Sequence, residues 1–351
     1  MVARIPVEVD ELGAEWLAGA LGLPVTRVEV LDRHSGTTGR ARLAVAYDDA
    51  SGPSTVFVKL APFDPRQRRF VDLVGLGTAE ARFYRDVASE VPVRVPAVHH
   101  ASVDDHAGDG GGRYVMVLED LVASGCRLLS PSDADVADSV AVIIDALARL
   151  HAPYWESPRL QDDLAWIAKG GRVAFEGGGP FIGKALEKFG DEMGPTFRRL
   201  AEIYVARTPE VAAVLASGAP TLIHGDPHLG NLFLDGATAG FFDWGMVWRA
   251  TGVRDFAYVL GNSTPTEVRR AHEREWLQHY LGVLRAAGIE LDESTAWDQY
   301  RVLVIYAWAS ATSTAAMGSR WQAVEVGEGG MGRATAAVED LESVDLLESL
   351  L

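Results

Sequence analysis

The hydrophobic pattern changes near residue 121, and this change limits the folds that the chain can adopt. Before it, three strand-like runs are separated by turn residues: TRVEVLD (26–32), RARLAVAYD (40–48) and STVFVKLA (54–61). Short runs of this kind are typical of an antiparallel meander. Two further strands are expected at PAVHHASV (96–103) and RYVMVLED (113–120), with an acidic glycine-rich segment between them. The N-terminal part therefore predicts a small antiparallel sheet.

Helical periodicity dominates after this point. Apolar residues recur at spacings of 4, 3, 4 and 3 in Val136, Val140, Ile143, Leu147 and Leu150. Such spacing places them on one buried helical face. The sequence predicts that Ser130 caps this helix, with Pro131 in its first turn. Earlier helices are predicted around residues 12–17 and over 78–89.

These patterns predict an α+β chain with two lobes. The boundaries are expected to enclose a small β-rich N-terminal lobe (1–118), a hinge (119–124) and a larger, mainly helical C-terminal lobe (125–351). The uncharged run between Arg301 and Arg320 contains several Ser and Thr residues, so it predicts a buried core helix rather than a membrane span. The glycines of 327–332 predict a mobile loop.

Charge and cysteine content narrow the functional class. The formal net charge of the 351 residues is −17, which argues against nucleic-acid and anionic-membrane partners. Cys126 is the single cysteine, so no intramolecular disulfide can form. Its neighbours favour an inert thiol. Together with the absence of an apolar signal segment at the start, these features lead us to expect a cytoplasmic protein.

The segment HGDPHLGN, residues 224–231, carries the most specific chemical signal. Its polar residues lie between two apolar runs, which a fold alone does not explain. His224, Asp226 and His228 could bind iron or zinc, as in a metal-dependent oxygenase, but the triplet is more compressed than such sites usually are. A nucleophilic site is less favoured, because no Gly-x-Ser-x-Gly elbow is present. A phosphate-transfer site explains more of the residues.

Kinases place a metal-binding Asn five residues after the catalytic Asp, and Asn231 follows Asp226 at that spacing. A second metal-binding aspartate is expected on a short hairpin, and Asp243 in FFDWG supplies it. A hairpin that turns around Ala237 pairs Asn231 with Asp243, with Cβ atoms roughly 5 Å apart. Two oxygen donors at that separation can share one Mg²⁺.

The N-terminal lobe offers the remaining parts of a kinase site. Gly36, Thr37, Thr38 and Gly39 form either a phosphate-covering glycine loop or a plain hairpin turn. Lys59 lies on the third strand-like run, where the ATP lysine of kinases belongs. Glu80 interrupts an apolar helical face that is made by Leu76, Phe83 and Val87. A buried carboxylate needs a partner, so Glu80 is predicted to pair with Lys59.

The chain resembles the aminoglycoside phosphotransferase family of the protein-kinase-like superfamily, near its choline and ecdysteroid kinase branch. The resemblance covers nearly the whole chain and is carried, in the family's order, by Lys59, Glu80, VMVLEDL, LARLHA, HGDPHLGN, FFDWG and GVRDFAY. It implies a bilobal protein-kinase-like fold. It also implies that adenine hydrogen-bonds to backbone near 118–121, which includes Glu119 and Leu121. Asp255 would brace the catalytic loop, and His224 and His151 would be structural.

The expected activity is transfer of the γ-phosphoryl group of MgATP to a hydroxyl of a small molecule. Asp226 would take the hydroxyl proton, Asn231 and Asp243 would hold Mg²⁺, and Lys59, oriented by Glu80, would contact the α/β-phosphates. No Ala-Pro-Glu segment follows Asp243, so a small alcohol is a better acceptor than a protein, and no protein partner is predicted. A nucleotide-binding module without transfer activity remains the alternative.

Two further features bear on the site. Trp244 and Trp248 flank the metal-binding turn and are the tryptophans expected to contact the acceptor. The segment 178–185 nearly matches a phosphate-binding P-loop, but Ala185 stands where the Mg²⁺-binding hydroxyl should be. We therefore expect its glycines to form a loop before a helix.

Overall fold

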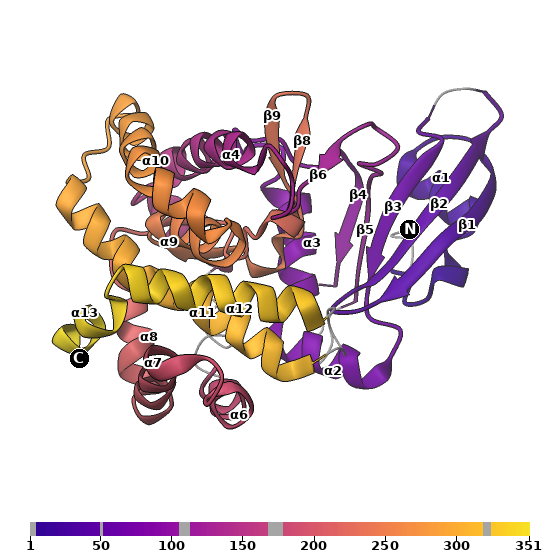
Figure 1. The fold of residues 1–351 in the computed structure, drawn as a ribbon. Coiled ribbons are helices and arrows are strands. Elements are labelled where there is room, and N and C mark those ends of the chain that lie inside the picture. The colour runs from indigo at the N-terminus through magenta and orange to yellow at the C-terminus, as the bar shows by residue number, and fades with distance from the viewer. Residues whose placement is uncertain (1–4, 50–51, 105–112, 168–177, 319–323) are drawn as a thin grey trace. The chain divides into compact units, whose positions relative to one another are not determined.

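A computed structural model describes residues 5–49, 52–104, 113–167, 178–318 and 324–351. The chain forms two compact units (Figure 1). Unit 1 comprises Met1–Arg127 and Phe241–Met246, and unit 2 comprises Leu128–Gly240 and Val247–Leu351. The acidic segment between the fourth and fifth predicted strands lies almost entirely outside the described residues.

Unit 1 is built on a five-stranded antiparallel sheet with the order β1-β2-β3-β5-β4. Its strands are β1 (Val25–Ser35), β2 (Gly39–Tyr47), β3 (Thr55–Leu60), β4 (Val98–Val103) and β5 (Tyr114–Glu119). Its helices are α1 (Ala14–Leu21), α2 (Pro65–Val74) and α3 (Leu76–Asp86), with short 3-10 turns at η1 (Val9–Glu11) and η5 (Trp244–Met246). All five predicted strands and both predicted N-terminal helices are therefore present.

Alternation along the strands decides which side chains enter the core of unit 1. Val56, Val58 and Leu60 on β3 are buried in one apolar cluster with residues of β2, β5 and α1. Successive side chains of a strand point to opposite faces, so the Lys59 side chain lies on the face of the sheet opposite this cluster. Helix α3 packs against strands β4 and β5, and its Glu80 meets Lys59 there.

Unit 2 is mainly helical. Its helices are α4 (Val136–His151), α6 (Gly179–Phe189), α7 (Gly194–Ala206), α8 (Thr208–Leu215), α9 (Val253–Tyr258), α10 (Thr266–Ala286), α11 (Glu293–Met317), α12 (Val324–Asp340) and α13 (Ser343–Leu350). Its shorter turns are η2 (Ala152–Tyr154), η3 (Pro158–Gln161), η4 (Leu229–Asn231) and the π-helical η6 (Val259–Ser263). Its short strands are β6 (Arg127–Leu128), which begins at the boundary, β7 (Thr221–Ile223), β8 (Leu232–Asp235), β9 (Thr238–Phe241) and β10 (Trp248–Ala250). A sheet in one unit and helices in the other confirm the α+β class.

Two predicted boundaries are wrong. Helix α4 begins at Val136 after Asp135, and not at Ser130. Ser130 instead closes a turn in which its N–H donates to Asp133 and its carbonyl accepts from the Asp133 N–H. Helix α6 begins at Gly179, so the expected loop of 178–183 is largely helical. A Cβ at Gly179 would meet Thr208 Oγ1 at 2.7 Å, so this glycine serves close packing.

The glycines of 327–332 lie in helix α12, so the predicted mobile loop is also wrong. Helices α11 and α12 lie side by side (Figure 1). A Cβ at Gly327 would come within 3.3 Å of the Ala315 backbone, and a Cβ at Gly330 within 3.5 Å of Ala311. Both glycines therefore allow a close approach of the two helices, which compensates for their poor helix propensity. Helix α11 is largely buried, as predicted, and no described helix has the length and apolar character needed to cross a membrane.

Replacing either of two helical glycines by alanine is expected to change the free energy of unfolding, in opposite directions. A Cβ at Gly332 meets nothing within 4 Å, so Gly332→Ala is expected to raise the free energy of unfolding by about 0.5–1 kcal/mol. A Cβ at Gly77 would lie 2.0 Å from the buried Tyr114 ring, so Gly77→Ala is expected to lower it by about 1–3 kcal/mol. Denaturant unfolding of both variants measures the two changes. Equal shifts for the two variants would contradict the packing assigned to α3.

Candidate active site

A buried ion pair joins strand β3 to helix α3 in unit 1. Lys59 Nζ lies 2.6 Å from Glu80 Oε1, and the two side chains are 4% and 1% exposed. The predicted pairing is therefore present. Burial raises the pKa of Glu80, and the Lys59 ammonium opposes that rise. The pair fixes the ammonium, because neither side chain can turn towards solvent without leaving a buried charge behind.

Asp243 joins the same cluster. Its Oδ1 lies 3.2 Å from Lys59 Nζ, and its Oδ2 lies 3.5 Å from the guanidinium of Arg40. Its φ of 63° is in the left-handed region, which aspartate tolerates better than most residues. Sequence reasoning missed Arg40. The strand register could have found it, because Arg40 on β2 is the direct partner of Lys59 on β3.

Trp244 anchors the turn that carries Asp243. Its ring stacks on Phe83 with centroids 3.8 Å apart, and its Nε1 donates to the Phe241 carbonyl at 3.2 Å. The expected acceptor contact of Trp244 is therefore wrong, because this ring is fully buried in unit 1. Trp248 in unit 2 is also buried. The Arg254 guanidinium packs over its ring, with Cζ 4.4 Å from the ring centroid.

The segment 36–39 forms the turn between β1 and β2. Ser35 pairs with Gly39, and the Gly36 N–H donates to the Thr38 carbonyl. Gly39 is required for packing, since a Cβ there would lie 2.5 Å from Phe63 and 2.6 Å from the Ala61 carbonyl. A hairpin turn is thus observed. Whether this turn also contacts phosphate remains a prediction.

The residues of the expected hinge have defined partners. Glu119 accepts hydrogen bonds from Arg94 NH2 at 2.7 Å and from the Ala97 N–H at 2.9 Å. Although burial opposes them, these bonds hold the pKa of Glu119 below its ordinary value. The Leu121 carbonyl accepts from the Cys126 N–H at 2.9 Å, and the Cys126 side chain is buried. These contacts hold the backbone at which adenine is expected.

In unit 2, the segment HGDPHLGN leaves strand β7 through Gly225, whose φ of 84° favours glycine. The carboxylate of Asp255 accepts from the backbone N–H groups of His224 at 2.7 Å and Gly225 at 2.9 Å. Asp255 also lies 3.3 Å from His151 Nε2. The side chains of Asp255, His224 and His151 are fully buried. The bracing contacts expected of Asp255, and the structural positions of His224 and His151, are thus observed.

The Asp226 carboxylate is contacted by Tyr258, Asn231 and His228, whose Nε2 lies 3.7 Å from its Oδ2. The Tyr258 hydroxyl donates to Asp226 Oδ1 at 2.5 Å, and Asn231 Nδ2 donates to Oδ2 at 3.2 Å and to the Asp226 carbonyl at 3.0 Å. Burial, followed by the Asp226 carboxylate, raises the pKa of Tyr258 well above its ordinary value, so the phenol keeps the proton that it donates. Ser310 Oγ lies 2.8 Å from the same hydroxyl. The carboxylate of Asp226 is thereby fixed in direction.

Sequence reasoning missed Tyr258 and Ser310. Tyr258 follows Asp255 by three residues on helix α9, and side chains at that spacing share a helix face. That spacing from a residue expected to brace the catalytic loop could have identified Tyr258 as a second residue near the loop. Ser310 is distant in sequence, and its place beside Tyr258 depends on how α11 packs against α9.

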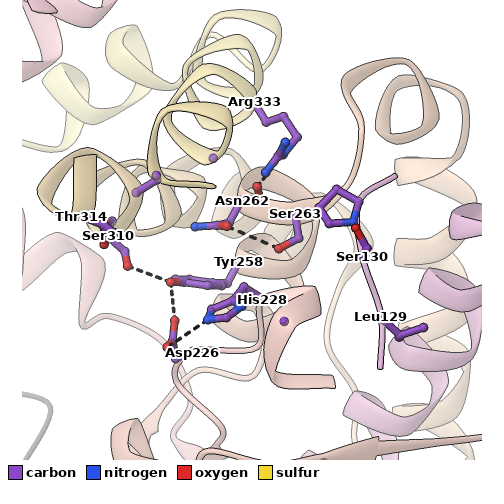
Figure 2. Close-up of a pocket in the computed structure, with 15 residues that line it drawn as sticks. Leu129, Ser130, Asp226, His228, Tyr258, Asn262, Ser263, Ser310, Thr314 and Arg333 are labelled. Carbon is purple, nitrogen blue, oxygen red and sulfur yellow. Dashed lines mark hydrogen bonds and ion pairs between the residues drawn. The ribbon is translucent and has the colours of Figure 1, made fainter. Parts of the chain in front are cut away.

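Asp226 lines a cavity of about 370 Å³ that lies within unit 2 (Figure 2). The described lining residues come from the segment before α4, from HGDPHLGN, and from α9, η6, α11 and α12. No tryptophan is among the 15 of them. The π-helical turn η6 places Asn262 and Ser263 at the cavity wall. Such turns are frequent at functional sites.

The oxygenase alternative is wrong for the part of the chain that the structure describes. No cluster of three or more His, Cys, Asp or Glu side chains there could hold a metal ion. The ring of His224 is buried, and its Nδ1 accepts from the Asp226 N–H at 3.3 Å. A Mg²⁺ site needs fewer protein ligands, since it typically uses one or two carboxylates with phosphate and water. The oxygen donors of Asp243 and Asn231 suit that ion.

The predicted hairpin is present as β8 and β9, but Asn231 lies in the turn η4 before β8 and Asp243 lies beyond the end of β9, so their predicted direct pairing in the strand ladder is not observed. The strands end at Asp235 and restart at Thr238, which leaves a two-residue turn of Gly236 and Ala237. Gly236 has a φ of 59°, as tight hairpins require. Asn231 belongs to unit 2 and Asp243 to unit 1, so their pairing on one ion remains a prediction.

A family model identifies the family of the chain, and solved structures show what its fold is similar to. The model of the phosphotransferase enzyme family (APH) matches residues 35–297. A solved structure from Ralstonia eutropha JMP134, described as that of an aminoglycoside phosphotransferase, is 14% identical with a TM-score of 0.53, covering 96% of this chain and 99% of the other. A choline/ethanolamine kinase family protein from Mesorhizobium loti is 15% identical with a TM-score of 0.46, covering 93% and 92%. Among curated proteins, no sequence matches.

Proposed function

The chain belongs to the phosphotransferase enzyme family, and from this premise we propose that it transfers the γ-phosphoryl group of MgATP to a hydroxyl of a small molecule. Membership confirms the family resemblance and makes the chain a phosphotransferase that acts on small molecules. The nucleotide, the metal and the hydroxyl acceptor are the content of the proposal. Its main support is Asp226, a carboxylate fixed by Tyr258 and Asn231 at the wall of a cavity large enough for a small acceptor.

Asp226 is proposed as the catalytic base. A carboxylate that accepts the hydrogen bond of an acceptor hydroxyl aligns that oxygen for attack and takes its proton as the bond to phosphorus forms. Tyr258 and Asn231 act through Asp226 as positioning residues. Because the carboxylate is already oriented, little reorganisation is needed when the acceptor binds.

The unit 1 cluster is proposed to hold the nucleotide. Lys59 would contact the α/β-phosphates, and Glu80 would keep its ammonium in place. Residues 36–39 would cover the phosphates, and backbone at Glu119 and Leu121 would bind adenine. Arg40 adds a second cation beside Asp243.

Asp243 and Asn231 are proposed to hold Mg²⁺, which would offset the negative charge of the phosphates when bound. The amide nitrogen of Asn231 is committed to Asp226, which leaves its amide oxygen as the atom that suits a cation. Asp243 faces Lys59 and Arg40, so cationic side chains already balance its charge.

The proposal predicts magnesium-dependent nucleotide binding. MgATP at 100 times its dissociation constant should add about 2.7 kcal/mol to the free energy of unfolding, because it binds the native state alone. ATP with a chelator should stabilise less. Thermal melts and calorimetry measure both effects. Tight ATP binding that is indifferent to magnesium would contradict the metal assignment, and binding without any transfer would favour the catalytically silent module.

A further inference from the structure

The cavity beside Asp226 has an unexpected charge. The chain carries 49 acidic residues against 32 Lys and Arg, which favours acidic surfaces and cationic ligands. Among the described residues that line the cavity, however, Asp226 supplies the one carboxylate and Arg333 the one guanidinium. With the lining histidine His228 counted as neutral, these two formal charges cancel, so the described lining has no excess negative charge that would attract a cationic acceptor.

Arg333 is held in place by backbone. Its Nε donates to the Asn262 carbonyl at 2.7 Å, which anchors the guanidinium at the π-helical turn η6 (Figure 2). The side chain is half-buried, and this burial lowers its pKa. No carboxylate forms an ion pair with Arg333 among the residues that the structure describes. A partly desolvated guanidinium without a protein anion is suited to a ligand anion, which it can bind through two parallel N–H donors.

The rest of the lining suits hydroxyl groups. Ser130, Ser263, Thr314 and Asn262 add hydroxyl and amide groups to the lining (Figure 2). Their hydroxyls already make protein hydrogen bonds, and each hydroxyl oxygen has two lone pairs with which it can accept. Tyr258 is the single Phe, Tyr or Trp residue among the described lining, and its hydroxyl is already bonded to Asp226 and Ser310. One committed ring does not make the aromatic cage that a quaternary ammonium ligand requires.

The charge and size of the cavity limit the anion. A volume of 370 Å³ is near the lower end of the roughly 300–1,000 Å³ range of ligand pockets, which favours a compact acceptor. One guanidinium balances one negative charge. A phosphate dianion would leave more uncompensated negative charge near Asp226 than a carboxylate would.

Resting on the proposed function, we infer that the acceptor is a small hydroxylated carboxylic acid whose carboxylate binds Arg333 while one hydroxyl meets Asp226. Polyamine sugars and choline-like alcohols are disfavoured, because their positive charge would face that of Arg333. The carboxylate fixes the acceptor at one end and so selects which hydroxyl reaches the catalytic base.

The experiment compares initial rates of phosphoryl transfer from MgATP to acceptors matched in carbon skeleton and different in charge. One set is galacturonate, galactose, galactosamine and galactose 6-phosphate, and another is glycerate, glycerol and 2-amino-1,3-propanediol. The carboxylate is expected to be the best acceptor of its set. An equal or faster rate with the neutral, amine or phosphate member would overturn the inference and leave the proposed function standing.

The variant Arg333→Gln tests whether this guanidinium binds the acceptor carboxylate. For the carboxylate acceptor, KM is expected to rise about ten- to a hundredfold, as for loss of a charged hydrogen-bonded partner, with a smaller change in kcat. The KM of the neutral acceptor should stay close to that of the parent. Arg333→Glu should shift the preference towards the amine. Arg285→Gln, at a side chain 63% exposed on α10 and outside the cavity, is the matched control and should change nothing.

Binding of MgATP by each variant shows that its fold is intact. A carboxylate preference that survives Arg333→Gln would overturn the role of this residue. If the parent binds MgATP but phosphorylates no member of any set, the proposed function fails, and this inference fails with it.

Discussion

Asp226→Asn is expected to lower phosphoryl transfer by about 10²–10⁴-fold, as loss of a general base does, while MgATP affinity stays near that of the parent. The substitution keeps the shape of the side chain and an oxygen that can accept from the Tyr258 hydroxyl. It removes the charge and the basic oxygen that the acceptor needs. MgATP affinity and the rate of turnover are measured for the parent and the variant. Where no acceptor is added, slow ATP hydrolysis gives the rate.

Two variants make this result specific. Asp243→Asn removes a proposed charged Mg²⁺ ligand, so it should weaken MgATP binding and transfer together. Asp235→Asn changes an exposed carboxylate on the same hairpin and should leave both unchanged. Near-normal turnover in Asp226→Asn would remove the base from the mechanism. Undiminished MgATP affinity in Asp243→Asn would remove the metal ligand.

Lys59→Ala is expected to lower the free energy of unfolding by about 3 kcal/mol, the lower end of the roughly 3–5 kcal/mol that loss of one buried partner costs. Glu80 would then face the interior without its cation, and Asp243 would retain only Arg40 of the two cations that contact it. Water at a nucleotide site would relieve part of this cost, which is why the lower end is expected. Glu80→Ala should cost a similar amount, because it leaves the ammonium buried.

A double-mutant cycle isolates the pair. Lys59→Ala with Glu80→Ala should cost clearly less than the sum of the two single changes, because removing both charges leaves neither buried alone. The exposed pair Arg27–Glu29 on β1, with side chains 76% and 59% exposed, is the control and should couple by about 0–1 kcal/mol. Strict additivity at Lys59 and Glu80 would contradict the buried ion pair.

The parts of the fold that the sequence predicted are those fixed by local periodicity. Strand alternation placed Lys59 on β3, and helical spacing placed Glu80 on an otherwise apolar face of α3. A buried charge must find a partner, so these two local patterns were enough to pair residues 21 positions apart. The antiparallel sheet followed from the same kind of reasoning, whereas the bracing contacts of Asp255 were implied by the family resemblance.

The misses arose where packing overrides local preference. Glycine-rich sequence usually indicates a loop, but in α12 the lack of a side chain lets the helix approach α11, and tertiary contact outweighs propensity. Ser130 and Pro131 look like a helix start, yet Ser130 uses its hydrogen bonds with Asp133 to close a turn before the helix. Trp244 is beside the proposed metal ligand in sequence, but its ring turns into the core against Phe83.

The cavity was the least predictable part of the site. Its described lining combines HGDPHLGN with residues from α11 and from α12, including Arg333, which lies more than a hundred positions from Asp226. No periodicity or motif links residues across that separation. Only the packing of α9, α11 and α12 brings them to one space, and this is why the acceptor class needed the structure.

In the proposed reaction, the γ-phosphoryl group of ATP moves to a hydroxyl under the control of Asp226. Phosphorus NMR of the parent enzyme with MgATP and an acceptor panel tests it most directly, because a phosphate monoester has a resonance distinct from ATP, ADP and free phosphate. With the parent, ADP and a new monoester are expected in equal amounts, and with Asp226→Asn neither is expected on the same time scale. Bound MgATP with no monoester from any acceptor, or a monoester formed equally fast by Asp226→Asn, would contradict it.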